Sequence, residues 1–231
     1  MRGSVCLAVC LLSSAVAWSA PVPKPTDEEK LKSDWGKVVD GVGDRKAKLV
    51  KNQLVLSSPG GLYNFDMDCD GDFLPLRVER EADGDFEVEV KMVRTTQPSH
   101  MSARIKDNRA SILNGLFLNN SKATVAFGRL LTAASDQGKD YFDQALFQHF
   151  EGGRRVTETK PNEGVHIRLT RRGDKVNLTH SADGKKWEKA EGYEAELPGP
   201  VTVGVYLWHT VDQPCEAVFE HFKLTPLKKE K

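Results

Sequence analysis

Residues 84–92 read GDFEVEVKM, and this short stretch decides the fold. From Phe86 to Met92 an apolar residue stands at every second position, with a charged residue between each pair. In an extended chain, this alternation places all the apolar side chains on one face of a strand. The dipeptide Asp83-Gly84 just before the run is typical of a tight turn. The stretch therefore predicts a half-buried β-strand that begins at a hairpin.

The same period of two recurs along the chain. The other stretches that show it are Leu54–Leu56, Val165–Leu169, Val176–Leu178 and Val201–Leu207. The composition of Tyr141–Phe150 fits either a helix or a strand, and its neighbours favour a strand. No long helical pattern occurs between Ala47 and Leu224. Many antiparallel strands joined by short turns indicate a single all-β domain, a sandwich or a barrel.

The N-terminal residues predict an export signal. Arg2 is followed by Val5–Ala17, an apolar run of 13 residues that ends in the small-x-small pattern Ala15-Val16-Ala17. This is typical of a secretory signal peptide covering residues 1–17, with residue 20 as an alternative end. The run is shorter than the roughly 18 apolar residues that a transmembrane helix needs, and no other segment approaches that length. We therefore expect a secreted or periplasmic protein without a membrane span.

The segments that flank the predicted domain differ from it. Residues 18–34 form a lead-in, in which the proline-rich Pro21–Pro25 is extended and Thr26–Glu29 matches the capping box of a short helix. The sandwich is expected to cover residues 35–225, and residues 226–231 form a basic tail.

The charge balance argues against one class of partner. The chain has 33 Lys and Arg against 33 Asp and Glu, so its formal net charge is zero. Proteins that bind nucleic acid normally carry a basic excess, so we expect no nucleic-acid partner. With 39% hydrophobic residues, the chain can still build a sizeable core.

Two cysteines remain once the predicted signal peptide is removed. Cys6 and Cys10 leave with it, and Cys69 and Cys215 stay. Two cysteines in an exported chain are a candidate disulfide. The alternative is a pair of free, buried thiols.

Three segments carry a resemblance to a known family. They are Gly84–Val90, Val165–Asp174 leading into Ser181–Trp187, and Val201–Val205 followed by Ala217–Leu224. In this order they look like a family of exported bacterial proteins of unknown function, related to proteins described as regulators of enolase. That family resembles the concanavalin-A-like lectin/glucanase sandwich, of which laminin-G modules are another branch.

The resemblance covers roughly residues 35–225 and implies two curved antiparallel sheets packed face to face, a jelly-roll sandwich. It carries no agreed catalytic residues, so none is transferred to this chain. In such folds the first and last strands often pair, which would bring Cys215 near the early strands and make a bridge to Cys69 possible. The last strand, Ala217–Leu224, keeps its alternation only if a bulge lies near His221.

A run of carboxylates between residues 66 and 72 is a candidate calcium site. Its members are Asp66, Asp68, Asp70 and Asp72. Hard oxygen ligands at alternate positions with Gly71 at the turn match the start of a calcium-binding loop. The match then fails, because Arg77 stands where the loop needs a bidentate glutamate. The alternatives are a Ca²⁺ site, the one cofactor that the sequence suggests, and an Asx-rich surface turn.

A second group of acids suggests the paired carboxylates of a glycosidase. Glu87 and Glu89 would lie on the same face of one strand, about 7 Å apart. The alternative is a solvated acidic face, because the Val and Phe residues of this strand point the other way. Catalysis is therefore the weaker interpretation for this pair.

Aromatic residues near the end of the chain are the candidate ligand contacts. Tyr206 and Trp208 lie on the face opposite Val205 and Leu207, where they could stack on sugar rings. His149 and Gln148 could add polar contacts. The alternative is that both sheet faces are covered, so that these aromatic residues only pack.

The Ser181–Trp187 segment resembles the Asp-box turn of sialidases, one residue short. That turn is a structural hairpin, so Trp187 is expected to pack across it.

The export signal and the strand pattern favour an exported β-sandwich, and the resemblance to the lectin-like fold implies a non-catalytic binding module, with carbohydrate as its expected ligand. Two other functions stay open: a glycan-cleaving hydrolase on the same sandwich, using Glu87 and Glu89, and a protein–protein interaction domain of a cell-surface assembly. The oligomeric state stays open as well.

Overall fold

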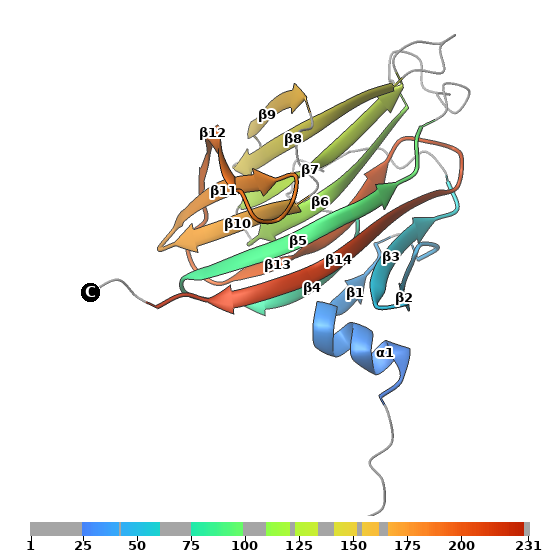
Figure 1. Ribbon diagram of the computed structural model, residues 1–231, viewed down its shortest axis with the longest axis horizontal. Coiled ribbons are helices and arrows are strands. Elements are labelled where there is room, and N and C mark those ends of the chain that lie inside the picture. Colours follow the sequence, from blue (N-terminus) through green and yellow to red (C-terminus); the bar gives the residue numbers. More distant parts are fainter. Residues whose placement is uncertain are drawn as a thin grey trace, which may run out of the picture.

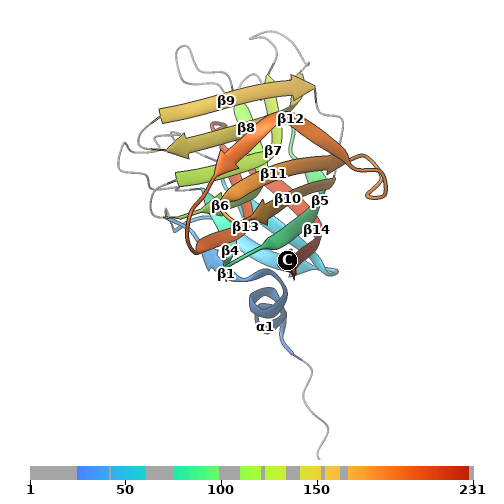
Figure 2. The same ribbon diagram turned by 90° about the vertical axis from the view of Figure 1, so that its left-hand side faces the viewer.

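The chain folds into two seven-stranded sheets that pack face to face (Figure 1, Figure 2). The computed structural model describes residues 25–41, 43–60, 75–98, 110–120, 123–133, 141–151, 154–161 and 166–228. Neighbouring strands run antiparallel throughout both sheets. The predicted two-sheet antiparallel β-sandwich is therefore confirmed.

The first sheet, called sheet A, holds the central part of the chain and its penultimate strand. Its spatial order is β1 (Lys37–Val39), β4 (Leu76–Ala82), β13 (Val201–His209), β6 (Ser111–Asn119), β7 (Ala123–Ala133), β8 (Tyr141–Glu151) and β9 (Arg154–Pro161). Strand β8 confirms the strand that was expected over residues 141–150.

The second sheet, called sheet B, joins both ends of the domain. Its spatial order is β12 (Glu188–Glu196), β11 (Lys175–Ser181), β10 (His166–Arg172), β5 (Phe86–Thr95), β14 (Cys215–Pro226), β3 (Gln53–Ser58) and β2 (Lys46–Val50). The last strand, β14, pairs with the early strand β3, and Cys215 lies opposite Ser58. Cys215 therefore lies beside the early strands, as the family resemblance implied.

Alternating burial explains why these segments are strands. In β5 the apolar residues from Phe86 to Met92 are buried, and the charged residues between them are only partly buried. In β13 the residues from Val201 to Leu207 that stand at odd positions are buried in the same core. Val165, the first residue of one predicted strand, lies outside the described residues, and β10 begins at His166. One hydrophobic cluster fills the space between the sheets and draws residues from both.

The predicted N-terminal helix forms and docks on the sandwich. It consists of α1 (Asp27–Lys30) and one π-helical turn, η1 (Leu31–Trp35). The capping box is complete, because the Glu29 amide donates to the Thr26 hydroxyl and the Thr26 amide donates to the Glu29 carboxylate. Leu31 and Trp35 are buried in the core, which stabilises a helix too short to persist alone.

A bulge in β14 lies next to the residue on which the helical segment packs. His221 adopts a positive φ of 56°, and the pairing of β14 with β5 shifts between Glu220 and Lys223. The bulge that was predicted near His221 is thereby confirmed. It accompanies Phe222, whose ring stacks on Trp35 with centroids 5.5 Å apart.

In the described part of the chain, no helix has both the length and the apolar character that crossing a membrane requires.

Candidate functional site

A second hydrophobic cluster lies outside the core. The face of sheet A that points away from sheet B is called the outer face. Tyr206 belongs to it, because its neighbours Val205 and Leu207 point into the core and successive side chains of a strand point to opposite faces. The cluster on this face, called the outer cluster, consists of Leu113, Phe117, Ala126 and Tyr206, with Leu130 and Trp208 packed against it.

Glycines shape the strands beneath the outer cluster. Gly115 of β6 lies opposite Tyr206 on one side and opposite Gly128 of β7 on the other, while Gly204 of β13 lies opposite Phe117. A Cβ atom added at Gly115 would collide with the Phe127 carbonyl, so the backbone approach at this position requires glycine. Each large ring thus stands opposite a residue without a side chain, an arrangement that lets aromatic rings cover glycines in a sheet.

The two aromatic candidates have different access to solvent. Tyr206 is 1% exposed, and burial raises the pKa of its phenol. Its ring meets Phe117 edge to face, with the centroids 6.3 Å apart. Trp208 is half-buried at the margin of the outer cluster. Trp208 is therefore partly accessible, although its indole Nε1 atom is buried, and Tyr206 is too buried to stack on a ligand and packs within the cluster instead.

Other apolar residues continue the outer cluster across the sheet, and the middle one, Leu113, is 1% exposed. Trp208 lies opposite Leu113, and Leu113 lies opposite Leu130, so an apolar row crosses three strands. Beside it, Arg77 of β4 lies opposite Tyr206 and pairs with Glu79, the guanidinium Nε standing 2.7 Å from the carboxylate Oε2. An apolar row bordered by a few polar groups is the usual composition of a small-ligand site.

The two polar candidates lie on the neighbouring strand β8. Gln148 stands in register with Ala126, a member of the outer cluster, and His149 stands in register with Val125, a member of the core. The side chains of both residues lie outside what the structure describes, so their ligand contacts stay predictions.

Glu87 and Glu89 lie on the other sheet. Both carboxylates pair with Arg168 of β10, whose Nε is 3.3 Å from Glu87 and whose Nη2 is 2.9 Å from Glu89. The guanidinium of Arg168 also stands 3.7 Å from the centre of the Trp187 ring. The two acids are thus engaged in cross-strand ion pairs on a face that does not carry the outer cluster. A catalytic role for this pair stays the weaker alternative.

The turn from Ser181 to Trp187 is held by its own side chains. Asp183 accepts hydrogen bonds from the amides of Lys185 and Lys186, at 2.8 and 2.9 Å, and these bonds lower the pKa of its carboxyl group. The Gly184 amide donates to the Ser181 hydroxyl at 2.9 Å. Trp187 packs across the turn against Arg168, which agrees with the structural role expected for this motif.

The proposed calcium ligands Asp66, Asp68, Asp70 and Asp72 lie outside the described residues, as does Cys69. Within the ranges given above, no three His, Cys, Asp or Glu side chains gather as metal ligands would. Cys215 carries a free, buried thiol, and burial raises its pKa to about 12. The calcium site and the bridge from Cys69 to Cys215 therefore stay predictions.

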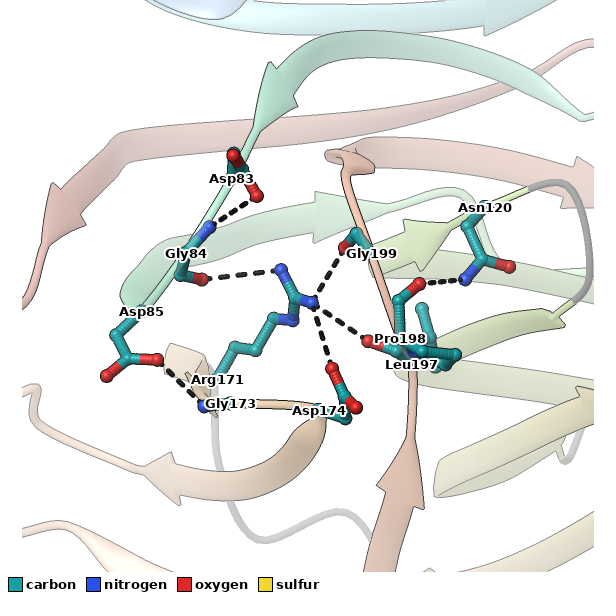
Figure 3. A network of polar contacts seen from close by, with 10 residues as sticks. All are labelled: Asp83, Gly84, Asp85, Asn120, Arg171, Gly173, Asp174, Leu197, Pro198 and Gly199. Carbon is teal, nitrogen blue, oxygen red and sulfur yellow. Dashed lines mark hydrogen bonds and ion pairs between the residues drawn. The ribbon is translucent and has the colours of Figure 1, made fainter.

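A buried arginine, missed in the sequence analysis, joins the turns at one end of the sandwich (Figure 3). Arg171 of β10 is only 3% exposed and donates to three backbone carbonyls, those of Gly84, Leu197 and Gly199, at 3.3, 3.0 and 2.7 Å. Asp174 adds an ion pair at 3.6 Å. Because Leu197 and Gly199 lead into β13, this network ties sheet B to sheet A.

A buried histidine forms a similar connection at the other end of β13. The Nε2 atom of His209 lies 2.7 Å from the hydroxyl of Ser58, which belongs to β3 of sheet B. The sequence carried a signal for both residues. Arg171 continues the series of every second residue, after Ile167 and Leu169, that points into the core. His209 follows the core residue Leu207 at the same spacing.

Comparisons with known proteins give a similarity of fold but no family. No protein-family model matches this sequence, and no curated protein matches it. Among solved structures, it is similar to a functionally unknown protein from Saccharomyces cerevisiae, with 14% identity and a TM-score of 0.54 over 80% of this chain and 93% of that one.

Two further similar structures are a glucanase and a carbohydrate-binding module. A β-glucanase from Bacillus licheniformis matches with 10% identity and a TM-score of 0.44 over 84% of this chain and 92% of that one. The carbohydrate-binding module CBM66 from Bacillus subtilis matches with 13% identity and a TM-score of 0.34 over 82% of this chain and 91% of that one. The match to the yeast protein, at 14% identity, shows a shared fold alone, and the relation to regulators of enolase stays a prediction.

Proposed function

We propose that this chain is an exported, non-catalytic protein that binds carbohydrate on the outer face of sheet A, against Trp208. The observation that carries this proposal is a half-buried tryptophan at the margin of a packed aromatic cluster, on a sheet face separate from the core. An indole ring offers a flat apolar surface for stacking, and because the Nε1 atom of Trp208 is buried, stacking carries the proposed contact. A sugar ring has the complementary form, with apolar C–H faces and a rim of hydroxyl groups.

The support beneath Trp208 favours binding. Trp208 packs against the outer cluster, whose Tyr206 and Phe117 rings meet edge to face and are almost fully buried. A side chain that is held in place before the ligand arrives loses little conformational freedom on binding. Trp208 and Leu130 are the half-buried ends of the row and lie on either side of Leu113, which is 1% exposed, so the surface available to a ligand lies at these two ends.

The position of the acids favours binding over hydrolysis. A glycosidase brings two carboxyl groups to the sugar, one of them as a proton donor. Glu87 and Glu89 share the guanidinium of Arg168 and lie on sheet B, whereas the aromatic surface lies on sheet A. The acid pair and the proposed sugar platform therefore belong to different sheets.

The direct test is a glycan array probed with the chain from residue 18 onward. The strongest glycan is then titrated into wild type and Trp208→Ala, and we expect the substitution to weaken affinity at least about tenfold. Trp187→Ala is the matched control, because Trp187 is also a half-buried tryptophan but lies at the edge of sheet B. We expect its affinity to stay within about twofold of wild type.

Three results would contradict the proposal. They are silence across the array, unchanged affinity in Trp208→Ala, and a loss in Trp187→Ala that equals the loss in Trp208→Ala. Release of reducing sugar from the bound glycan, abolished in Glu87→Gln or Glu89→Gln, would support the hydrolase instead.

Export is tested separately. When the full chain is expressed in a secreting bacterial host, we expect N-terminal sequencing of the exported protein to begin at residue 18, or at residue 21 if the alternative cleavage site is used. Retention of Met1 in a cytoplasmic product would contradict this part of the proposal.

A further inference from the structure

His209 stands directly behind the proposed ligand surface. It follows Trp208 in β13, so the two side chains point to opposite faces of sheet A. Trp208 lies on the outer face, while His209 is 1% exposed and points between the sheets. Its Nε2 atom is 2.7 Å from the Ser58 hydroxyl and its Nδ1 atom is 3.1 Å from the Val211 carbonyl. The histidine therefore connects the end of β13 to sheet B.

The partners of this ring define its protonation state. A carbonyl oxygen only accepts hydrogen bonds, so Nδ1 carries the proton and donates to Val211. The Nε2 atom then accepts from the Ser58 hydroxyl. A second proton on Nε2 would change this atom from an acceptor into a donor. The Ser58 hydroxyl would have to turn, and its own hydrogen would need a different acceptor.

The charged neighbours oppose a positive charge on this ring. Arg45, in the loop before β2, is buried and pairs with Asp40 at 2.6 Å. Burial, followed by the charge of Arg45, lowers the pKa of His209, while the Val211 carbonyl and Asp44 act in the opposite direction, and the result is a pKa of about 4. Cys215 of β14 lies opposite Ser58 of β3. Its thiol is neutral between pH 4 and pH 7 because burial raises its pKa.

The same strand end is attached to sheet A on its other side. His209 lies opposite Ile112 of β6. Just beyond it, the Thr210 amide donates to the Ser111 carbonyl at 2.8 Å, and the Ser111 amide donates to the Thr210 hydroxyl at 3.0 Å. If protonation reverses the bond to Ser58 and leaves the Ser58 hydrogen without its acceptor, the end of β13 stays bound to β6 while its link to sheet B is weakened.

We infer that His209 is a positioning residue for Trp208, and that protonation of His209 weakens the link between the end of β13 and sheet B and thereby weakens ligand binding on the outer face. This inference rests on the proposed carbohydrate function. Binding would then be reversible with pH, strong at neutral pH and weak in acid.

The experiment follows the indole N–H resonance of Trp208 by NMR between pH 7 and pH 4, in wild type and in His209→Gln. Trp208→Phe assigns the resonance. Glutamine keeps a polar side chain of similar reach but does not titrate in this range. In wild type we expect the resonance to move reversibly below about pH 5 and to be halfway to its acid position near pH 4, where His209 titrates in the folded chain, and we expect the affinity for the array-selected glycan to be about twofold lower at pH 4 than at pH 7. In His209→Gln we expect neither change.

His221→Gln is the matched control. This histidine is exposed, with 73% of its side chain accessible, and it lies on β14 of sheet B. We expect its pH profile to equal that of wild type. If His209→Gln does not fold, Ser58→Ala replaces it, because it removes the partner on sheet B without changing a titratable group. We expect its Trp208 resonance at pH 7 to lie already near the acid position of wild type.

A pH response in His209→Gln equal to that of wild type would overturn the inference, as would a wild-type Trp208 resonance that does not move. In Ser58→Ala, a resonance and pH response unchanged from wild type would overturn it as well. The resonance is measured without ligand, so it decides the inference even if no glycan binds. Silence of the array with a titrating Trp208 resonance would therefore count against the proposed function alone.

Discussion

Arg171 and His209 occupy positions where their strands otherwise place Ile, Val and Leu. Both side chains are buried, and both satisfy their polar atoms largely with backbone or side-chain groups that belong to other strands or to turns. A buried polar group is costly without a partner and contributes to one defined arrangement when it has partners. At the scale of single residues, these two side chains set how the sheets are joined at the two ends of β13.

The buried histidine predicts that stability falls in acid. In the unfolded chain His209 titrates near 6.5, and in the folded chain its pKa is about 4. The unfolded state therefore binds the proton first, so the stabilisation present above pH 6.5 is lost as the pH falls toward 4. The loss amounts to roughly 3 kcal/mol. Urea unfolding of wild type and His209→Gln at pH 7 and pH 4.5 measures it, and an equal acid loss in both proteins would contradict the assignment.

Cys215 predicts a slow thiol reaction in the folded chain. Its sulfur is buried and its pKa is raised to about 12, so almost no thiolate is present at pH 8. We expect iodoacetamide to leave Cys215 unmodified in buffer, as followed by mass spectrometry. Rapid labelling of the folded protein would contradict the burial.

The predicted bridge is tested in denaturant without reductant. Labelling of both Cys69 and Cys215 would contradict the bridge, and protection of both until reductant is added would confirm it.

At the scale of elements, Arg171 connects three turns that lie far apart in the sequence. Figure 3 shows its guanidinium between the β4–β5 turn, the turn after β10 and the segment that leads into β13. The Gly173 amide adds a bond of 2.7 Å to the Asp85 carboxylate, and Asn120 donates to the Pro198 carbonyl at 2.9 Å. This end of the sandwich is therefore held by polar contacts between turns in addition to the apolar core.

Replacement of Arg171 by Met should destabilise the fold strongly. Met fills much of the volume but leaves the carbonyls of Leu197 and Gly199 without their donor. We expect the free energy of unfolding to fall by about 3 kcal/mol, as measured by urea denaturation. Arg172→Met is the control, because Arg172 lies on the other face of the same strand and donates to the Lys228 carbonyl at the surface. We expect a loss below about 1 kcal/mol there, and similar losses in both variants would contradict the special role of Arg171.

The elements themselves were largely predictable. Alternation identified β5, β10, β11 and β13, and the break in alternation near His221 identified the bulge. The network of Arg171 was not predicted, because two consecutive arginines beside a glycine look like a solvated turn. The same is true of the outer cluster. Strand β6 carries apolar residues on both faces, and both faces are buried. Its sequence therefore has no alternation that would separate the outer cluster from the core.

At the scale of the whole molecule, the two outer faces differ in character. The face of sheet B that points away from sheet A carries ion pairs between neighbouring strands. Examples are Arg168 with Glu89 and Lys91 with Glu220, both at 2.9 Å. The outer face of sheet A carries the outer cluster and Trp208. Cross-strand ion pairs keep an exposed sheet face soluble, whereas an aromatic cluster with an accessible margin is suited to a ligand.

Binding of carbohydrate to the outer face of sheet A is measured residue by residue in a chemical-shift titration. The array-selected glycan is added to the isotope-labelled chain, and the perturbed amides and indoles are mapped. We expect the largest changes at Trp208 and Leu130, the half-buried residues of the row, while Trp187, Glu87 and Glu89 stay unchanged. Changes centred on Trp187 and the two glutamates, or no saturable change at any residue, would contradict it.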